Sequence, residues 1–159
     1  MAPPPAQLRT YRPSDFEILY RIDQICFPRG IAYEQFELKV YLQSEGSHCL
    51  VAEVGGDVVG FILAELALDA GHIITLDVLE NYRRHGIGSL LLAAAEKEAG
   101  SRGVKRMVLE TATTNKAAIA LWRKHGYRQF ATIENYYGRG VNAFGMAKQI
   151  GELLHNKEP

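Results

Sequence analysis

The segment that most constrains how this chain folds is residues 78–91, which read VLENYRRHGIGSLL. An apolar, strand-like run ends at Val78, and apolar residues at helical spacing begin at Ile87. The basic loop between them contains two glycines, so a ligand can approach its backbone closely. The helix that follows presents unpaired N–H groups and a partial positive charge at its N-terminus. The segment therefore predicts an anion-binding loop between a strand and a helix, suited to a phosphate or pyrophosphate group.

Two common phosphate-binding motifs do not fit this loop. A dinucleotide fingerprint needs a third glycine, and that position is Leu91. A Walker A loop needs Gly-Lys followed by Ser or Thr, and the chain contains no such run. The remaining pattern is Arg-x-x-Gly-x-Gly, formed by Arg83, Gly86 and Gly88. The alternative is an ordinary strand–helix turn whose basic residues face water.

The composition excludes several classes of protein. Lys plus Arg and Asp plus Glu number 18 each, so the net charge is zero, whereas a general nucleic-acid or membrane-surface binder needs a basic excess. No apolar run approaches the roughly 20 residues of a membrane span, and the N-terminal residues lack the apolar core of a signal peptide. We expect a cytoplasmic protein with a flexible tail at 1–6, one domain at 7–150 and a polar tail at 151–159. Cys26 and Cys49 lack metal-ligand spacing and are expected to be free thiols, and the scattered histidines predict no metal site.

Hydrophobic periodicity and turn residues predict the order β-α-α-β-β-β-α-β-α-β-β. Strands are expected over residues 7–12, 48–54, 58–68, 71–79, 106–111, 127–137 and 141–148. Helices are expected after a Ser14–Glu17 capping box, over about 33–43, from Ile87 to about 100, and from an Asn115 cap to Gly126. Gly55 and Gly56 predict a tight hairpin. Early hairpins and one βαβ crossover give an α/β (α+β) fold, with a mixed sheet and helices on both faces.

The loop motif, the element order and several later segments resemble the GNAT superfamily of N-acetyltransferases over nearly the whole chain. The resemblance is strongest to ribosomal-protein alanine N-acetyltransferases and to the catalytic subunits of N-terminal acetyltransferases. The segments that carry it are 82–88, 109–110, 115–121, 126–127, 135–137 and 142–146. Of these, Asn135-Tyr136-Tyr137 is the most diagnostic of the subfamily. The resemblance implies a single-domain fold with a mostly antiparallel sheet of six to seven strands and about four helices. It also implies acetyl-CoA as cofactor, coenzyme A as product, and a protein or peptide N-terminus as substrate.

The resemblance also implies a cofactor site. Its members are Leu76, Asp77, Val78, Arg83, Arg84, His85, Gly86, Ile87, Gly88, Ser89, Asn115 and Trp122. The first three lie at the strand end, where the backbone N–H of Val78 matches the family's donor to the oxyanion of the tetrahedral intermediate. The arginines and the glycine-rich turn match the pyrophosphate loop.

The predicted chemistry needs a base, because only a neutral amine attacks a thioester. An α-amino group has a pKa near 7.7–8.0, so a single carboxylate suffices as the base, and Glu110 matches the family's proton acceptor. The family's acid, a tyrosine, is replaced here by Trp122, whose indole N–H is a hydrogen-bond donor but not a practical acid. Proton transfer to the thiolate is therefore assigned to water or Tyr137. Trp122 either contacts the sulfur or packs in the core. His72 is a minor candidate base.

The predicted substrate-binding residues are Phe27, Pro28, Tyr33, Glu110, Tyr136 and Tyr137. Phe27 and Pro28 resemble the loop that admits the peptide in the family. Because side chains alternate across a strand, one of Tyr136 and Tyr137 is expected to face the substrate and the other to pack or to reach the opposite side.

Two other functions remain open at this stage. One is a GNAT enzyme that acetylates a small amine or a lysine side chain. The other is an acyl-CoA-binding module without turnover, which the tryptophan at the acid position keeps open. The expected oligomeric state is a monomer or a dimer, with no nucleic-acid or membrane partner.

Overall fold

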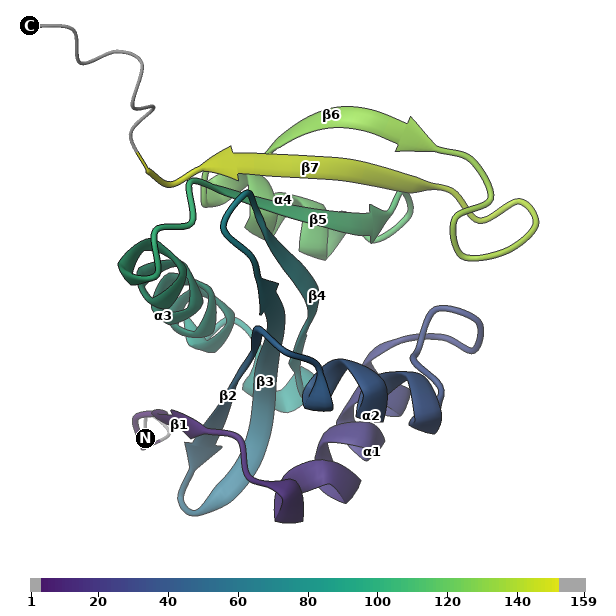
Figure 1. The fold of residues 1–159 in the computed structure, drawn as a ribbon. Helices are drawn as coiled ribbons and strands as arrows, with labels where there is room; N and C mark the ends of the chain where they lie inside the picture. The colour runs from purple at the N-terminus through teal and green to yellow at the C-terminus, as the bar shows by residue number, and fades with distance from the viewer. Residues whose placement is uncertain (1–3, 152–159) are drawn as a thin grey trace, which may run out of the picture. The chain divides into compact units, whose positions relative to one another are not determined.

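The computed structural model describes residues 4–151 and contains one seven-stranded sheet with strand order β1-β2-β3-β4-β5-β7-β6 (Figure 1). The strands are β1 (Gln7–Thr10), β2 (Ser47–Val54), β3 (Asp57–Leu66), β4 (Gly71–Val78), β5 (Arg106–Ala112), β6 (Arg128–Ile133) and β7 (Ala143–Gln149). The α-helices are α1 (Phe16–Cys26), α2 (Gln35–Gln43), α3 (Ile87–Ser101) and α4 (Lys116–Lys124), with short 3-10 helices η1 (Pro13–Asp15) and η2 (Glu80–Tyr82). The predicted element order and the mostly antiparallel sheet are confirmed.

Within the described residues the chain forms two compact units. Unit 1 comprises residues 4–65 and 74–95, and unit 2 comprises residues 66–73 and 96–151. No helix between residues 4 and 151 is both long and apolar enough to cross a bilayer. Most of the two tails predicted at 1–6 and 151–159 lies outside the described residues.

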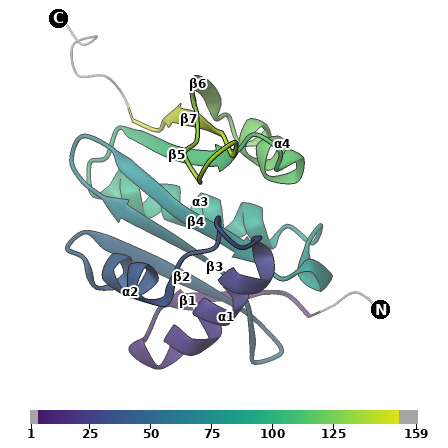
Figure 2. The same cartoon turned by 90° about the vertical axis from the view of Figure 1, so that its right-hand side faces the viewer.

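Unit 1 is built on the predicted hairpin of β2 and β3. Gly55 and Gly56 both have positive φ, 59° and 88°, which a two-residue turn of this kind requires. The helices α1 and α2 lie on one face of β1–β3, and the first part of α3 lies on the other (Figure 2). The core of this unit contains apolar side chains from α1, α2 and the strands: Phe16, Leu19, Ile22, Leu38, Cys49, Val51, Phe61, Leu63 and Ile74.

The start of α1 differs from the prediction. The Ser14–Glu17 capping box does not form. Instead the Asp15 carboxylate accepts the Arg12 backbone N–H at 2.8 Å and pairs with the Arg9 guanidinium at 2.8 Å. Pro13–Asp15 consequently forms a 3-10 turn, and the α-helix begins at Phe16. The hydrogen bond from Arg9 holds the pKa of Asp15 below its ordinary value, despite partial burial.

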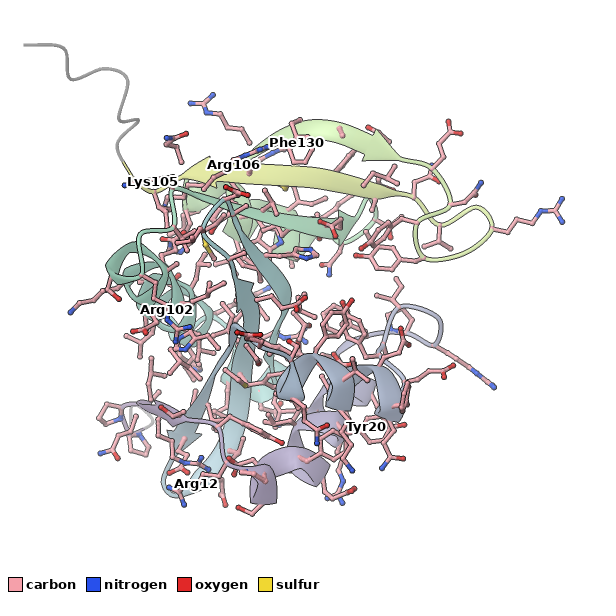
Figure 3. All side chains as sticks on the ribbon, in the orientation of Figure 1. Arg12, Tyr20, Arg102, Lys105, Arg106 and Phe130 are labelled. Atoms are coloured by element: carbon pink, nitrogen blue, oxygen red, sulfur yellow. The ribbon has the colours of Figure 1, made fainter. Side chains whose placement is uncertain are left out.

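Unit 2 contains β5, β7 and β6, which pair antiparallel, with α4 beside them (Figure 1). Its core includes Ala99, Val104, Met107, Leu109, Ala112, Ile119, Trp122, Tyr127, Ala143 and Met146. The first residues of β4 pair with β5 in parallel, Gly71 opposite Met107 and His72 opposite Val108. Figure 3 shows the Arg106 side chain beside the Phe130 ring, with the guanidinium carbon 5.3 Å from the ring centroid.

The predicted strand over 127–137 is wrong at its C-terminal end. β6 ends at Ile133, and Asn135 has a φ of 58°, which lies in the left-handed region and is incompatible with a strand. The Asn142 side chain accepts the Asn135 N–H at 2.9 Å, and the Asn135 side chain accepts the Gly140 N–H at 2.7 Å. Side-chain hydrogen bonds of this kind stabilise a compact loop in place of strand pairing.

Gly60 in β3 allows a close approach to β4. A Cβ atom at this position would lie 2.6 Å from the Asp77 carbonyl oxygen, a backbone atom that cannot rotate away. We expect Gly60→Ala to lower the free energy of unfolding by about 1–3 kcal/mol, the usual range for overpacking. Gly100→Ala in α3 is the control, because a Cβ there meets nothing within 4 Å. It should raise stability by up to about 1 kcal/mol through helix propensity. Equal stability of the two variants in urea titrations would contradict the assigned strand contact.

Candidate active site

The predicted anion-binding loop lies in unit 1, between η2 and α3. Gly86 has a φ of 81°, and a Cβ there would meet nothing within 4 Å. Arg84 also adopts a positive φ, 65°, which is uncommon for a residue with a side chain. The Leu90 N–H bonds the Gly86 carbonyl at 2.9 Å, so the helical hydrogen bonds begin directly after the turn. A helix leaves its first backbone N–H groups without partners inside the helix, so a turn of this kind is suited to an anion.

The two arginines of this loop have different surroundings. Arg83 Nε donates to the Val78 carbonyl at 2.8 Å, which ties the loop to the end of β4. Arg84 and His85 are exposed, and within residues 4–151 the Arg84 side chain has no hydrogen bond or ion pair. The geometry therefore favours Arg84 over Arg83 as a free positive charge for a ligand.

The residues predicted at the end of β4 are Leu76, Asp77 and Val78. The Asp77 side chain is 1% exposed and accepts a hydrogen bond from the Thr75 hydroxyl, so it is directed into the unit. Only the main chain of Asp77 could therefore contact a cofactor. The Val78 carbonyl accepts Arg83 Nε and, at 3.5 Å, the Cys26 thiol. The predicted oxyanion role of the Val78 N–H stays a prediction.

The loop between α1 and α2 carries the predicted substrate residues of unit 1. Phe27 is half-buried and Pro28 is exposed, and the Pro28 carbonyl accepts the N–H groups of Ile31 and Ala32 at 3.0 and 3.1 Å. Tyr33, at the end of the loop, donates its hydroxyl to the Ile74 carbonyl at 3.1 Å. The loop is thus folded into a turn and fixed to β4 at one end.

In unit 2, the Glu110 carboxylate is the centre of a hydrogen-bonded cluster. Its Oε1 accepts the Tyr136 hydroxyl at 2.7 Å and lies 2.9 Å from His72 Nε2, which is also 3.2 Å from Oε2. Because an ionised carboxylate only accepts hydrogen bonds, Nε2 carries the proton in this arrangement. The Tyr137 hydroxyl donates to the Glu110 backbone carbonyl at 3.2 Å. Both tyrosines are therefore bound to the residue predicted as the base.

The cluster determines the charge of Glu110. Burial alone would raise its pKa, but the hydrogen bonds from His72 and Tyr136 outweigh burial and lower the pKa. The side chain is 17% exposed, so the carboxylate is accessible and remains ionised at neutral pH. A carboxylate held in this way can accept a proton and has lone pairs left for a substrate.

The strand alternation predicted for Tyr136 and Tyr137 is wrong. They lie in the turn after β6, and both hydroxyls reach Glu110. Their rings meet edge to face, with centroids 4.8 Å apart. Burial, followed by the Glu110 charge, raises the pKa of Tyr137 to about 12. Tyr137 therefore holds its proton at neutral pH, and its predicted acid role stays a prediction.

Asn115 and Trp122, the predicted cofactor residues of unit 2, lie at the start and in the body of α4. The Asn115 side chain accepts the Ala118 N–H at 3.1 Å, which confirms the helix cap. Trp122 is 6% exposed and packs edge to face on Tyr127, with centroids 5.7 Å apart. Its indole N–H is buried and lacks a hydrogen-bond partner among residues 4–151. Trp122 is thus a core residue that retains an unused donor.

Three residues in or near the cluster have a larger role than the sequence indicates. His72 was only a minor candidate, yet its pairing with Val108 puts it next to Glu110, because Glu110 lies two residues further along β5 on the same face. Asn135 and Asn142 were noted only as part of a resemblance, although they shape the loop that carries both tyrosines. The predicted parallel pairing of β4 and β5 was the available signal for His72. No local feature of the sequence indicates the register of the pairing between β4 and β5.

Comparisons with known proteins point to one family. The family described as "Acetyltransferase (GNAT) family" matches residues 16–127. An N-alpha-acetyltransferase from Sulfurisphaera tokodaii is 30% identical, over 91% of this chain and 93% of that protein. The ribosomal-protein-S18-alanine N-acetyltransferase from Escherichia coli, a solved structure, has a TM-score of 0.84 at 26% identity and covers 97% of this chain and 99% of its own. NAA60 from Arabidopsis thaliana in complex with acetyl-CoA has a TM-score of 0.80 at 23% identity, covering 92% and 99%, which shows a shared fold.

The Glu110 cluster predicts the effect of removing one donor. Tyr136→Phe deletes the hydroxyl that bonds the carboxylate, so the pKa of Glu110 should rise, because the charged form loses a stabilising hydrogen bond. Tyr137→Phe is the matched control, since its hydroxyl bonds the backbone carbonyl instead. An NMR titration of the Glu110 carboxyl carbon measures both effects. An unchanged Glu110 pKa in Tyr136→Phe would contradict the cluster.

Proposed function

The chain belongs to the acetyltransferase (GNAT) family, and from that premise we propose that it transfers the acetyl group of acetyl-CoA to the α-amino group at the N-terminus of a protein or peptide. It is an N-acetyltransferase, as the names of its relatives indicate. The observation that carries the substrate proposal is the Glu110 carboxylate, held ionised by His72 and Tyr136. The S. tokodaii relative bears the name N-alpha-acetyltransferase, which supports the choice of an α-amine.

The proposed reaction is direct attack of the amine on the thioester. The neutral nitrogen forms a bond to the acetyl carbon, the carbon–sulfur bond breaks, and the Glu110 carboxylate accepts the proton from the nitrogen. An α-amine has a pKa near 7.7–8.0, so a useful fraction is neutral at physiological pH, whereas lysine, near 10.4, is almost fully charged. A carboxylate of lowered pKa is a weak base, which fits an α-amine better than a lysine side chain.

The cofactor assignment rests on the loop after β4. The proposed ligands of the acetyl-CoA pyrophosphate are the Arg84 guanidinium and the backbone N–H groups of residues 86–89, with Arg83, His85 and Asn115 as further candidates. The free guanidinium of Arg84 and the open backbone at Gly86 support this assignment. The N–H of Val78 is proposed as the donor to the oxyanion.

The proposed leaving group departs as a thiolate. Tyr137, with a pKa of about 12, holds its proton too strongly to act as an efficient acid. A thiol has a pKa near 8.5, so its thiolate is a tolerable leaving group without an acid. The unpartnered indole N–H of Trp122 supports a hydrogen bond to the sulfur rather than proton transfer.

The proposal is tested with two peptides of one sequence that lacks lysine, one with a free N-terminus and one with a formylated N-terminus. With acetyl-CoA and this protein, release of free thiol should occur only with the free peptide. Mass spectrometry should show the addition of one acetyl group to it. Tight binding of acetyl-CoA without thiol release from any of a panel of free N-termini would contradict the proposal and favour a non-catalytic acyl-CoA-binding module.

The cofactor assignment predicts a selective loss of binding. Gly88→Val places a branched side chain on the first turn of α3, where the pyrophosphate is proposed to approach the backbone, so acetyl-CoA affinity should fall. Gly100→Val, at the other end of the same helix, is the control, because a Cβ there has open space. Calorimetry on folded variants measures both affinities. Unchanged affinity in Gly88→Val would remove the loop from the cofactor site.

The base assignment predicts a loss of turnover. Glu110→Gln keeps the shape of the side chain but removes the proton acceptor, so kcat should fall by about 10²–10⁴, the usual range for a general base. The loss should shrink as the pH rises and the amine deprotonates by itself. Glu45→Gln, at an exposed position, is the control. If Glu110→Gln has near-normal turnover at neutral pH, Glu110 is a structural residue only.

A further inference from the structure

Two aspartates, Asp23 of α1 and Asp77 of β4, are enclosed in the core of unit 1. They are 0% and 1% exposed. Asp23 Oδ2 accepts the Tyr33 backbone N–H at 2.7 Å, and Asp77 Oδ1 accepts the Thr75 hydroxyl. The other two oxygens, Asp23 Oδ1 and Asp77 Oδ2, are fully buried and receive no hydrogen bond from any other group in the described chain. Each carboxyl group shifts the pKa of the other, so the two lie within hydrogen-bonding reach and a shared proton would satisfy both buried oxygens.

A hydrogen bond between two carboxyl groups requires a proton on one of them. Burial and the neighbouring Asp23 raise the pKa of Asp77 far above its ordinary value, and burial also raises the pKa of Asp23. The other titratable groups near Asp77 are the thiols of Cys26 and Cys49 and the guanidinium of Arg83. Burial raises the pKa of both thiols, so both are neutral, and the positive charge of Arg83 lowers the pKa of Asp77 only in part. Two adjacent carboxylates in a dry core repel each other, which favours one proton on the pair.

Asp23 anchors the end of the loop between α1 and α2. Tyr33 donates its N–H to Asp23, accepts the Gln24 side-chain amide at its carbonyl at 2.7 Å, and donates its hydroxyl to Ile74 at 3.1 Å. Its ring also packs edge to face on Tyr41, with centroids 5.6 Å apart. With the shared proton on Asp77, the Asp23 carboxyl that accepts the Tyr33 N–H is the ionised one. Hydrogen bonds to charged groups are roughly twice as strong as neutral ones.

We propose that Asp23 and Asp77 share a single proton and act as positioning residues, whose hydrogen bond holds the loop of Phe27 and Pro28 in the shape that receives the substrate's N-terminus. This inference rests on the proposed function for the role of the loop. Protonated Asp77 donates to Asp23, Asp23 accepts from Tyr33, and Tyr33 ends the loop. Neither aspartate touches the substrate. Their effect is therefore on peptide binding and not on the chemical step.

Replacing Asp77 by asparagine tests whether the pair needs a neutral hydrogen-bond donor or a second negative charge at this position. Asp77→Asn reproduces the protonated acid, because its NH₂ group donates to Asp23 and its oxygen accepts from Thr75. This variant should keep the peptide KM of the wild type. Asp23→Ala removes the acceptor of the Tyr33 N–H, so KM should rise by about tenfold, as expected for one hydrogen bond to a charged group. kcat and the acetyl-CoA affinity should change little.

Two further measurements do not depend on activity. The exchange rate of the Tyr33 amide hydrogen should be slow in the wild type and in Asp77→Asn, and faster in Asp23→Ala. Difference infrared spectra of the wild type against Asp77→Asn should contain a protonated-carboxyl band at neutral pH. These readouts apply even if no peptide is acetylated, so failure of this inference is distinct from failure of the proposed function.

Three results would overturn the inference. One is an Asp77→Asn variant whose peptide KM rises as much as that of Asp23→Ala, which would show that a second negative charge is needed. Another is an unchanged Tyr33 exchange rate in folded Asp23→Ala. The third is an absent protonated-carboxyl band, which would show that both aspartates are ionised.

Discussion

The hydrogen bonds that Glu110 accepts from His72 and Tyr136 are the interaction on which the proposed chemistry depends. Without them, burial would raise the pKa of this carboxylate, which is 17% exposed. The two donors come from distant parts of the chain and converge because of the pairing of β4 with β5 and the loop after β6. The loop is in turn shaped by Asn135 and Asn142. The state of the base is thus set by the fold of unit 2.

The surroundings of Glu110 and Asp77 shift the pKa values of these two carboxyl groups in opposite directions. Glu110 meets two hydrogen-bond donors, and its pKa is lowered. Asp77 meets another carboxyl group in a dry core, and its pKa is raised. Separate pKa values for similar groups are typical of proteins that use one group for proton transfer and another as a neutral donor. In this chain the ionised group is assigned to catalysis and the neutral one to the position of a loop.

Local patterns in the sequence were sufficient for much of the fold. Two glycines with positive φ gave the β2–β3 hairpin, and the change from strand to helical periodicity gave the loop between β4 and α3. Glu110 and Asn115 were placed correctly, as a partly exposed strand residue and a helix cap. These features depend on a few neighbouring residues and therefore appear in the sequence itself.

Features that depend on distant residues could not be predicted in this way. The side-chain hydrogen bonds of Asn135 end β6 early and bring Tyr136 and Tyr137 to the same residue, against the expected alternation. Asp23 and Asp77 are 54 positions apart in the numbering, and nothing near either one indicates that they meet in a core. In both cases the tertiary contact overrides the local pattern.

The most direct test of the account is a competition within one peptide that carries both a free N-terminus and a lysine side chain. The peptide is incubated with acetyl-CoA and the protein at neutral pH, and tandem mass spectrometry locates the acetyl group. The account predicts acetylation at the α-amino group, with the lysine unmodified, because a carboxylate of low pKa serves a neutral α-amine and not a charged lysine. Acetylation of the lysine with a free α-amino group remaining would contradict it.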